Sequence, residues 1–186
     1  MVLEPLTEAH LSDLAKVARH DDIWTYLDEA TPEAEQEVDS LITEALQEQE
    51  QGSRLPFAII NRDDARAIGT ISYIDIQPTH HGLEIGWAWI SPAYWSKGIA
   101  RESSYLLMRH AFEDLGAVRI AFKTDSRNVR SQRAIEGLGA TREGVFRNHR
   151  ILRDGFLRTS HFYSVIADEW PAVRASIEAR SRSSAG

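Results

Sequence analysis

The spacing of apolar residues alternates along the chain between a helical and a strand pattern. Apolar side chains three or four positions apart predict helices at 7–18, 31–46, 101–115 and 129–138, and a short helix opening at 169–171. Alternating or continuous apolar runs predict strands at 3–6, 57–60, 67–76, 83–90, 118–122, 141–152 and 156–166. Helices that precede, interrupt and follow the strands indicate one α+β domain. We expect this domain over residues 1–179, followed by a disordered polar tail at 180–186.

The most informative segment is the turn between the strand at 83–90 and the helix that follows it. Its sequence is Tyr94-Trp95-Ser96-Lys97-Gly98-Ile99-Ala100. The first amides of a helix have no partner within the helix, and the helix dipole favours an anion at that end. Gly98 lets the backbone approach a bulky ligand, and Lys97 adds a positive charge. An anion site and an ordinary strand-to-helix turn are both compatible with this segment alone.

Charge is distributed unevenly over the 186 residues. Residues 1–93 carry 18 acidic and 5 basic side chains, a charge of −13, and residues 94–186 carry 10 acidic and 16 basic, a charge of +6; together they give the net charge of −7. The basic half begins at the candidate anion turn, which suits a small ligand that carries phosphates. The acidic half argues against a nucleic-acid footprint over the whole molecule. A chance asymmetry of a solvated surface is the alternative explanation.

Several kinds of chemistry have no support in the sequence. The chain has no cysteine, which excludes disulfides, thiolate metal sites and a cysteine nucleophile. No spacing of His, Asp and Glu indicates a metal site. The first residues do not resemble a signal peptide, and no apolar stretch reaches membrane-spanning length. We therefore expect a cytoplasmic protein with no metal, no membrane and no nucleic-acid partner.

Three motifs occur in a fixed order along the chain. Leu83-Glu84-Ile85-Gly86-Trp87 precedes the turn at 94–100, and Asn128-Val129-Arg130-Ser131 with Glu136-Gly137-Leu138-Gly139-Ala140 follows it. In this order the motifs resemble those of the GNAT superfamily of acetyltransferases, and within it the RimJ/RimL-type N-acetyltransferases. The resemblance extends from Leu3 to Pro171. Each motif alone is unspecific, so it is the ordered set that carries the resemblance.

The resemblance implies an α/β/α fold whose mixed sheet, of about six to seven strands, splays apart at the centre and binds acetyl-coenzyme A (acetyl-CoA) in the gap. The pyrophosphate is expected on the backbone amides of Lys97, Gly98, Ile99, Ala100 and Arg101. Ile90 is expected to pair its backbone with the pantetheine arm, and Asn128 to form a hydrogen bond with the same arm. Arg133, grouped with Arg127 and Arg130, suits the 3′-phosphate, although a solvated helix face explains that group equally well. Trp95, also expected at the cofactor, stands where the wider superfamily often has Gln or Arg and where this subfamily usually has an aromatic residue.

Two residues are candidates for catalysis, because the attacking amine must be neutral and the thiolate must leave. By the resemblance, Glu84 matches a strand glutamate that serves as general base in related histone acetyltransferases; a structural glutamate is the alternative. Ser131 matches a serine that RimJ/RimL-like enzymes have three residues after the asparagine, and it is expected to donate a proton to the thiolate. The position of the tyrosine acid of many superfamily members holds Ile135 here. The alternative role of Ser131 is that of a polar residue in the first turn of a helix.

Aromatic residues and the terminal hairpin are expected on the acceptor side. Trp24, Tyr26 and Trp87 are candidates for the walls of the acceptor pocket, with core packing as the alternative for Trp87. His149 precedes the hairpin turn, in a region that often borders the acceptor site in this family.

The sequence therefore predicts an N-acetyltransferase that moves acetyl from acetyl-CoA to a primary amine, which is either a protein N-terminus or a small molecule. A non-catalytic module that binds or senses acyl-CoA with the same fold is the alternative. The protein is expected to be a monomer or a homodimer. The identity of the acceptor is left open.

Overall fold

The computed structural model describes residues 1–183, and residues 184–186 lie outside the description. The strands are β1 (Val2–Pro5), β2 (Arg54–Ile60), β3 (Ala67–Gln77), β4 (Gly82–Ile90), β5 (Arg119–Asp125), β6 (Thr141–Ile151) and β7 (Leu157–Ile166). The α-helices are α1 (Leu11–Ala18), α2 (Asp21–Trp24), α3 (Glu35–Glu50), α4 (Ile99–Glu113), α5 (Val129–Gly137) and α6 (Trp170–Ser183). Short 3-10 helices are η1 (Glu8–His10), η2 (Pro78–His80) and η3 (Pro92–Tyr94).

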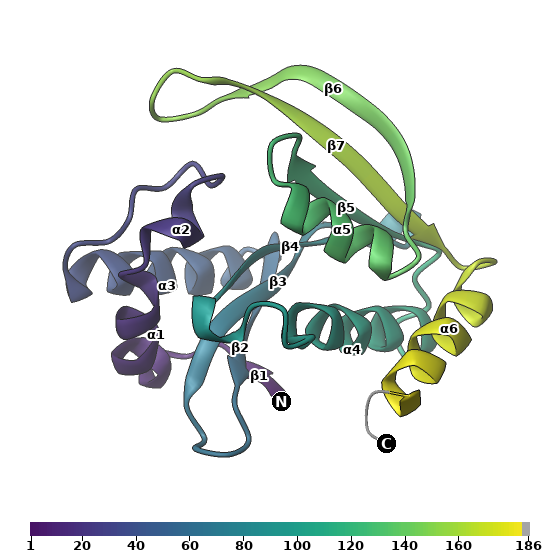
Figure 1. Cartoon of the computed structure of the whole chain (residues 1–186), viewed down its shortest axis with the longest axis horizontal. Helices are drawn as coiled ribbons and strands as arrows, with labels where there is room; N and C mark the ends of the chain where they lie inside the picture. Colours follow the sequence, from purple (N-terminus) through teal and green to yellow (C-terminus); the bar gives the residue numbers. More distant parts are fainter. Residues whose placement is uncertain (184–186) are drawn as a thin grey trace.

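All seven strands belong to one sheet in the order β1-β2-β3-β4-β5-β7-β6. Neighbouring strands are antiparallel except β4 and β5, which run parallel. The expected mixed sheet of six to seven strands with flanking helices is thereby confirmed. Figure 1 shows the β6–β7 hairpin arching over the rest of the sheet, with its turn above α2. Within residues 1–183, no helix is long and apolar enough to cross a membrane.

Two apolar clusters pack on opposite faces of the sheet. One joins α4, α5 and α6 to the central strands and includes the fully buried Met108 and Ile120. The other joins α1 and α3 to β2, with Leu14 and Val38 at its centre. Each large apolar side chain buried in this way stabilises the fold by roughly 1.5–3 kcal/mol relative to an exposed one. The two clusters hold the sheet between helical layers and so fix the positions of the strand ends.

Helix α3 begins later than the Thr31-Pro32 signal predicts. It starts at Glu35, because the Glu37 carboxylate accepts hydrogen bonds from the backbone N–H groups of Glu33 at 2.6 Å and Ala34 at 3.4 Å. These bonds satisfy donors that a helix leaves unpaired at its start. At the other end of the chain, α6 continues to Ser183, beyond the expected end of the domain at 179. The remainder of the expected tail, 184–186, is outside the described residues.

Strand β4 does not keep the predicted two-residue alternation. The pairing of β3 with β4 shifts register between Thr70 and Ser72, and Trp87 has a positive φ of 50°. This is a β-bulge, which inserts an extra residue and redirects the side chains after it. Ile85 therefore belongs to the α4 side of the sheet, whereas Trp89 packs on the α1–α3 side. Strict alternation along a strand at 83–90 would place both residues on one face, and the bulge prevents this.

Candidate active site

A cavity lies where β4 and β5 separate. The two strands pair only at Gly82–Glu84 and Arg119–Ala121, and they diverge beyond these residues. The gap holds a cavity of about 930 Å³, lined by the end of β4, the start of α4, the end of β5 and one face of α5. The segment after α2 and the start of β7 complete its wall. The diverging edges leave backbone groups that an extended ligand can pair with, as a strand would.

The start of α4 has the geometry of an anion site. Gly98 is its N-cap, with a φ of 81°, and the first helical bond runs from the Glu102 N–H to the Gly98 carbonyl at 2.9 Å. The amides of residues 99–101 therefore lack partners within the helix, and these residues line the cavity. The Lys97 amide already donates to the Tyr94 carbonyl at 3.3 Å, so we expect Lys97 to contribute its ammonium group instead. This cradle fits the pyrophosphate of a coenzyme A molecule.

Trp95 and Arg130 close the cavity beside the cradle. The Trp95 indole Nε1 donates a hydrogen bond to the Ile90 carbonyl at 2.9 Å, and the Arg130 guanidinium lies over the Trp95 ring at 3.4 Å. Burial lowers the pKa of Arg130. The Ile90 carbonyl has a second lone pair, so its bond to Trp95 does not prevent pairing with the pantetheine arm. Arg133 also lines the cavity, from an exposed position on α5.

Asn128 and Ser131 occupy the start of α5. The Asn128 Oδ1 accepts the Ser131 backbone N–H at 3.0 Å, which makes Asn128 the N-cap of the helix. Since its oxygen is used in this way, the side-chain NH₂ of Asn128 is the group that can donate to a cofactor. Ser131 is half-buried and lines the same cavity, as does the buried Ile135 one turn later. Both predicted residues thus reach the cavity wall.

Glu84 is buried at the point where β4 and β5 separate, but it is not part of the cavity lining. Its side chain is 8% exposed, and its Oε2 accepts a hydrogen bond from the Lys123 ammonium at 3.1 Å. Lys123 does line the cavity, and so does Gly86, where an added Cβ would lie 3.2 Å from the Glu84 Oε1. The carboxylate therefore stands directly behind the wall. It can take up a proton from the cavity only through Lys123 or a bridging water.

The far wall is built around a second ion pair. Asp125, whose side chain is fully buried, accepts the Arg127 Nη2 at 2.7 Å and the Arg127 backbone N–H at 2.8 Å. The Arg127 guanidinium lies 3.7 Å from the Phe156 ring centre and 5.7 Å from that of Tyr26. In the hairpin turn, Arg153 donates to the Glu29 carbonyl. These contacts join the hairpin to the segment after α2, and Tyr26, a candidate acceptor residue, lines the cavity.

The structure does not bring the other predicted acceptor residues together. Trp24 is 1% exposed, its Nε1 donates to the Ala18 carbonyl at 2.7 Å, and its ring packs 5.6 Å from that of Trp89; it lies outside the cavity lining. Trp87 does line the cavity, half-buried, with the Arg54 guanidinium 4.7 Å from its ring centre. Core packing therefore accounts for Trp24, whereas Trp87 remains a candidate wall residue.

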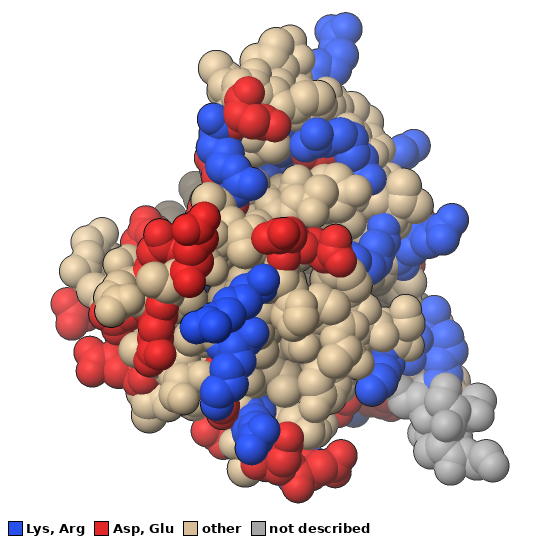
Figure 2. Space-filling model, turned by 60° about the vertical axis from the view of Figure 1, so that its left-hand side comes forward, with Lys and Arg blue, Asp and Glu red and all other residues tan. Residues whose placement is uncertain are grey.

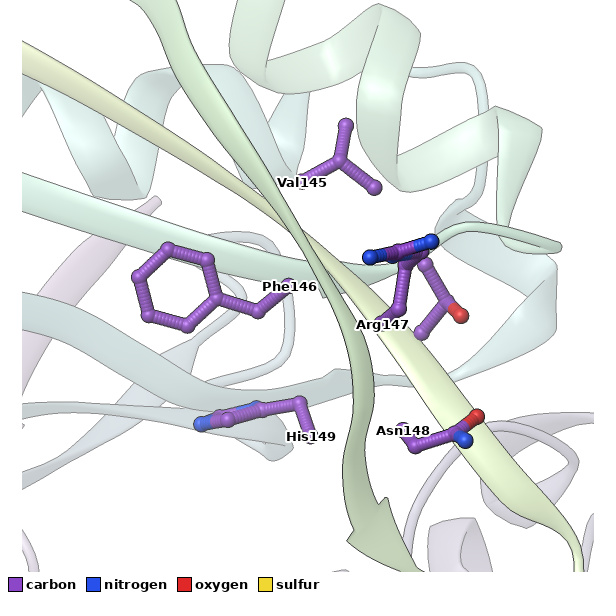
Figure 3. Close-up of a pocket in the computed structure, with 6 residues that line it drawn as sticks. Val145, Phe146, Arg147, Asn148 and His149 are labelled. Atoms are coloured by element: carbon purple, nitrogen blue, oxygen red, sulfur yellow. The ribbon is translucent and has the colours of Figure 1, made fainter.

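His149 lines a separate hollow on the hairpin. This hollow, of about 730 Å³, is bordered by Val145, Phe146, Arg147, Asn148, His149 and Thr159. Figure 3 shows Phe146 and His149 pointing to the same side of β6, away from Asn148. The His149 Nδ1 lies 3.1 Å from the Ser160 hydroxyl, and burial, followed by the charge of Lys123, lowers the pKa of the imidazole. The charge of Lys123 therefore acts on His149, although His149 is not part of the main cavity lining.

Lys123 and Arg158 are cavity residues that sequence reasoning did not single out. Lys123 stands near the end of a predicted strand, and Arg158 near the start of another. Nothing local distinguishes them, because their positions depend on how β5 pairs with β7. Charges are unevenly distributed over the surface: Figure 2 shows acidic side chains crowding the left of the molecule, with basic ones at the top and along the right-hand edge.

Comparison with known proteins identifies relatives of this chain. Among curated proteins, the N-acetyltransferase YoaA of Bacillus subtilis is 26% identical over 168 residues, which cover 89% of this chain and 93% of that protein. The N-acetyltransferase YnaD of the same organism is 29% identical over 114 residues, 61% of this chain and 65% of that protein. Both are described as uncharacterized.

Solved structures share the fold closely. A T. thermophilus protein assigned as an acetyltransferase is 40% identical, with a TM-score of 0.85 over 96% of this chain and 92% of that one. A GCN5-related N-acetyltransferase from Brucella melitensis is 28% identical, with a TM-score of 0.88 over 95% and 80% of the two chains. RimJ of Mycobacterium smegmatis, solved in complex with CoA-disulfide, is 19% identical with a TM-score of 0.84 over 97% and 88%, a similarity of fold alone.

The family follows from a match over most of the chain. Residues 1–141 match the family described as the acetyltransferase (GNAT) domain, and these residues include β4, the cradle at the start of α4, Asn128 and Ser131. The cavity, with the unpaired backbone amides of residues 99–101 in its wall, suits the coenzyme that this family uses. The chain belongs to the GNAT family of acetyltransferases, enzymes that use acetyl-CoA as their acetyl donor.

Proposed function

We propose that this protein transfers the acetyl group of acetyl-CoA to a primary amine by direct attack on the thioester. The observation that supports the proposal is a single cavity that joins the partner-free amides of α4 to Ser131 and to the Lys123–Glu84 pair. A cavity that bound acetyl-CoA only as a sensor would not need a buried carboxylate behind the opposite wall. The non-catalytic module therefore becomes the second candidate.

In this proposal one end of the cavity binds acetyl-CoA, and the other end removes the proton from the amine. Acetyl-CoA supplies the activated acetyl thioester. The amides of residues 99–101 and the Lys97 ammonium bind phosphate, and the Asn128 NH₂ donates to the extended arm. The Ser131 hydroxyl donates a hydrogen bond to the departing thiolate. At the other end, Glu84 receives the proton of the amine through water or Lys123, which makes the amine nucleophilic.

Two substitutions test the catalytic roles. Glu84→Gln should lower kcat/KM for a good acceptor about 100-fold or more, since general-base catalysis contributes roughly 10²–10⁴-fold. Ser131→Ala should lower kcat about 10-fold, because it removes one hydrogen bond to a developing charge. Release of free thiol from acetyl-CoA measures turnover, with peptides and small amines as parallel acceptors. The dissociation constant for acetyl-CoA should stay within about twofold of the wild-type value.

A matched control separates catalysis from folding. Glu143→Gln also removes a carboxylate paired to a basic residue of β5, Arg119, but Glu143 lies outside the cavity lining. It should leave kcat/KM unchanged. Full turnover by both the Glu84 and the Ser131 variants would refute the assignment of catalytic residues. Tight binding of acetyl-CoA with no thiol release for any acceptor would favour the binding module.

The proposal also includes a finer assignment of the protein as a RimJ/RimL-type N-acetyltransferase of the cytoplasm. Its acceptor is then a protein N-terminal amine or a small-molecule amine. Acceptors of both kinds occur among the relatives: YdaF of Bacillus subtilis, 29% identical over 107 residues, is assigned as a ribosomal N-acetyltransferase, and a protein of similar fold from Vibrio cholerae, 18% identical, is a spermidine N-acetyltransferase solved with CoA and spermine. The parallel peptide and amine arms of the thiol-release screen decide between them, and light scattering distinguishes a monomer from a homodimer.

A further inference from the structure

Arg158 stands at the open end of the gap between β4 and β5. Ser160 on β7 pairs with Asp125, the last residue of β5, so Arg158 lies beyond the end of that strand. On its other side it pairs with Arg150 of β6. Because side chains alternate along a strand, Arg158 shares a face with Ser160. Arg158 lines the main cavity together with Lys123 and Asp125.

The Arg158 guanidinium is partly buried without a counter-ion. Its Nε is buried and has no hydrogen-bond partner, and among residues 1–180, whose side chains the structure describes, no hydrogen bond or ion pair involves its side chain. Desolvation lowers the pKa of Arg158, the nearby charges of Arg150 and Arg127 lower it further, and those of Asp125 and Glu84 oppose the shift. Removing a guanidinium from water without a partner is unfavourable. A residue held in this state is prepared to bind an anion that comes from outside the chain.

The two carboxylates near Arg158 already accept hydrogen bonds from other residues. Asp125 accepts hydrogen bonds from both the side chain and the backbone of Arg127, and Glu84 accepts one from Lys123. The residues that we propose to bind phosphate stand at the start of α4, at the β4 end of the gap, whereas Arg158 stands on β7, on the far side of β5 from β4. The cofactor's own phosphates are therefore expected at that end. We therefore expect the anion that completes Arg158 to come from the second substrate.

We propose that Arg158 is a specificity-determining residue that binds a carboxylate or phosphate group of the amine acceptor. This inference rests on the proposed acetyl transfer and narrows its substrate class to amines that carry an anionic group. The amine would lie toward Lys123 and Glu84, and the anionic group toward the start of β7. An acidic residue near a peptide N-terminus, a free amino acid carboxylate and an aminoalkyl phosphate all meet this requirement.

Matched acceptor pairs test the proposal. The pairs are β-alanine and β-alaninamide, phosphoethanolamine and ethanolamine, and the peptides Ser-Glu-amide and Ser-Gln-amide, each assayed by thiol release. The wild-type protein should favour the anionic member of at least one pair by about 10-fold or more in kcat/KM, and the preferred pair identifies the source of the anion. Arg158→Gln should lower kcat/KM for that member about 10- to 100-fold and leave the neutral member unchanged, since it removes a charged hydrogen bond. Arg158→Lys should restore part of the preference.

Controls distinguish anion binding from a structural or cofactor role. Arg150→Gln removes the same charge from the position opposite Arg158, but Arg150 is exposed and does not line the cavity, so it should change the preference less than about threefold. The melting temperature of the Arg158→Gln variant should not fall, because no internal ion pair is lost. Equal losses for both members of every pair, or a weaker affinity for acetyl-CoA in this variant, would overturn the proposal. The proposal would also be overturned if the wild-type protein had equal kcat/KM for the anionic and the neutral member of every pair.

A binding measurement keeps the inference separate from the proposed function. Arginine side-chain Nε–H resonances can be followed by NMR in protein saturated with CoA, with the Arg158→Lys variant assigning the Arg158 signal. Glutarate and inorganic phosphate serve as probes. A shift of the Arg158 signal in either titration supports the anion site even if no acceptor is acetylated, an outcome that would sink the proposed function alone. An Arg158 signal that responds to neither probe refutes the anion site, whatever the activity.

Discussion

At the scale of single residues, the Asp125–Arg127 pair shows how the chain holds a charge inside the cavity wall. Burial alone would raise the pKa of Asp125, but the hydrogen bonds and charge of Arg127 outweigh it, and the net pKa is lower than usual. A carboxyl whose pKa is depressed on folding contributes stability above its unfolded pKa. That contribution is lost as the pH falls through the folded pKa.

Asp125→Asn should therefore change how stability depends on pH. At pH 7 the variant should lose about 1–3 kcal/mol of the free energy of unfolding, because Arg127 loses its charged partner. The difference from wild type should shrink as the pH is lowered below about 4, where an unfolded aspartate takes up its proton. Urea unfolding at several pH values measures it. Asp168→Asn, at an exposed position, is the control, and a constant difference at all pH values would contradict the role given to Asp125.

At the scale of elements, the turn into α4 depends on Gly98. Its φ of 81° is a left-handed conformation, and an added Cβ would meet only the end of the Arg101 side chain, at 3.7 Å. The cost of a larger residue is thus backbone strain rather than a clash. Gly116, after α4, has a φ of 68° with nothing within 4 Å of an added Cβ, so it reproduces the strain away from the cavity.

Gly98→Ala and Gly116→Ala should each lower the free energy of unfolding by about 1–2 kcal/mol, the cost of a left-handed backbone for a residue with a Cβ. Only Gly98→Ala should weaken acetyl-CoA binding, by about 5-fold or more, since small shifts of the amides at 99–101 misplace donors to the phosphates. Calorimetric titration with acetyl-CoA compares the two variants. Equal affinities would show that the turn at Gly98 does not hold the cofactor.

Elements also mark the limit of what the sequence could predict. The cradle at 94–101 was predictable because strand, turn and helix start are contiguous, and its signals are local. The strands and the hairpin followed from periodicity for the same reason. The bulge at Trp87 has no clear local signal, and it sends Trp89 against Trp24 in the core. The position of Arg158 depends on the register of β7 against β5, which pairs residues more than thirty positions apart in the chain.

At the scale of the whole molecule, two segments distant in the sequence meet beside the part of the cavity that we propose for the acceptor. The hairpin turn provides Arg153 and Phe156, and the segment after α2 provides Tyr26 and Glu29. Arg127 lies between the two aromatic rings. Figure 1 shows the hairpin spanning the sheet toward α2. Because side chains rather than paired strands make this connection, we expect it to open more easily than the sheet.

Weakening the connection should affect the acceptor and spare the cofactor. Arg153→Ala removes the hydrogen bond to the Glu29 carbonyl and should raise the KM for the acceptor about 2- to 10-fold, because the hairpin must then be ordered when the acceptor binds. The affinity for acetyl-CoA should not change, since we propose that its phosphates bind at the start of α4. Hydrogen exchange should become faster at residues 25–31 and 152–157 and stay constant in α4. Arg142→Ala, which removes an exposed arginine of β6 far along the strand from the turn, should change none of these quantities. Faster exchange with an unchanged acceptor KM would mean that the hairpin closes the molecule without shaping the acceptor site.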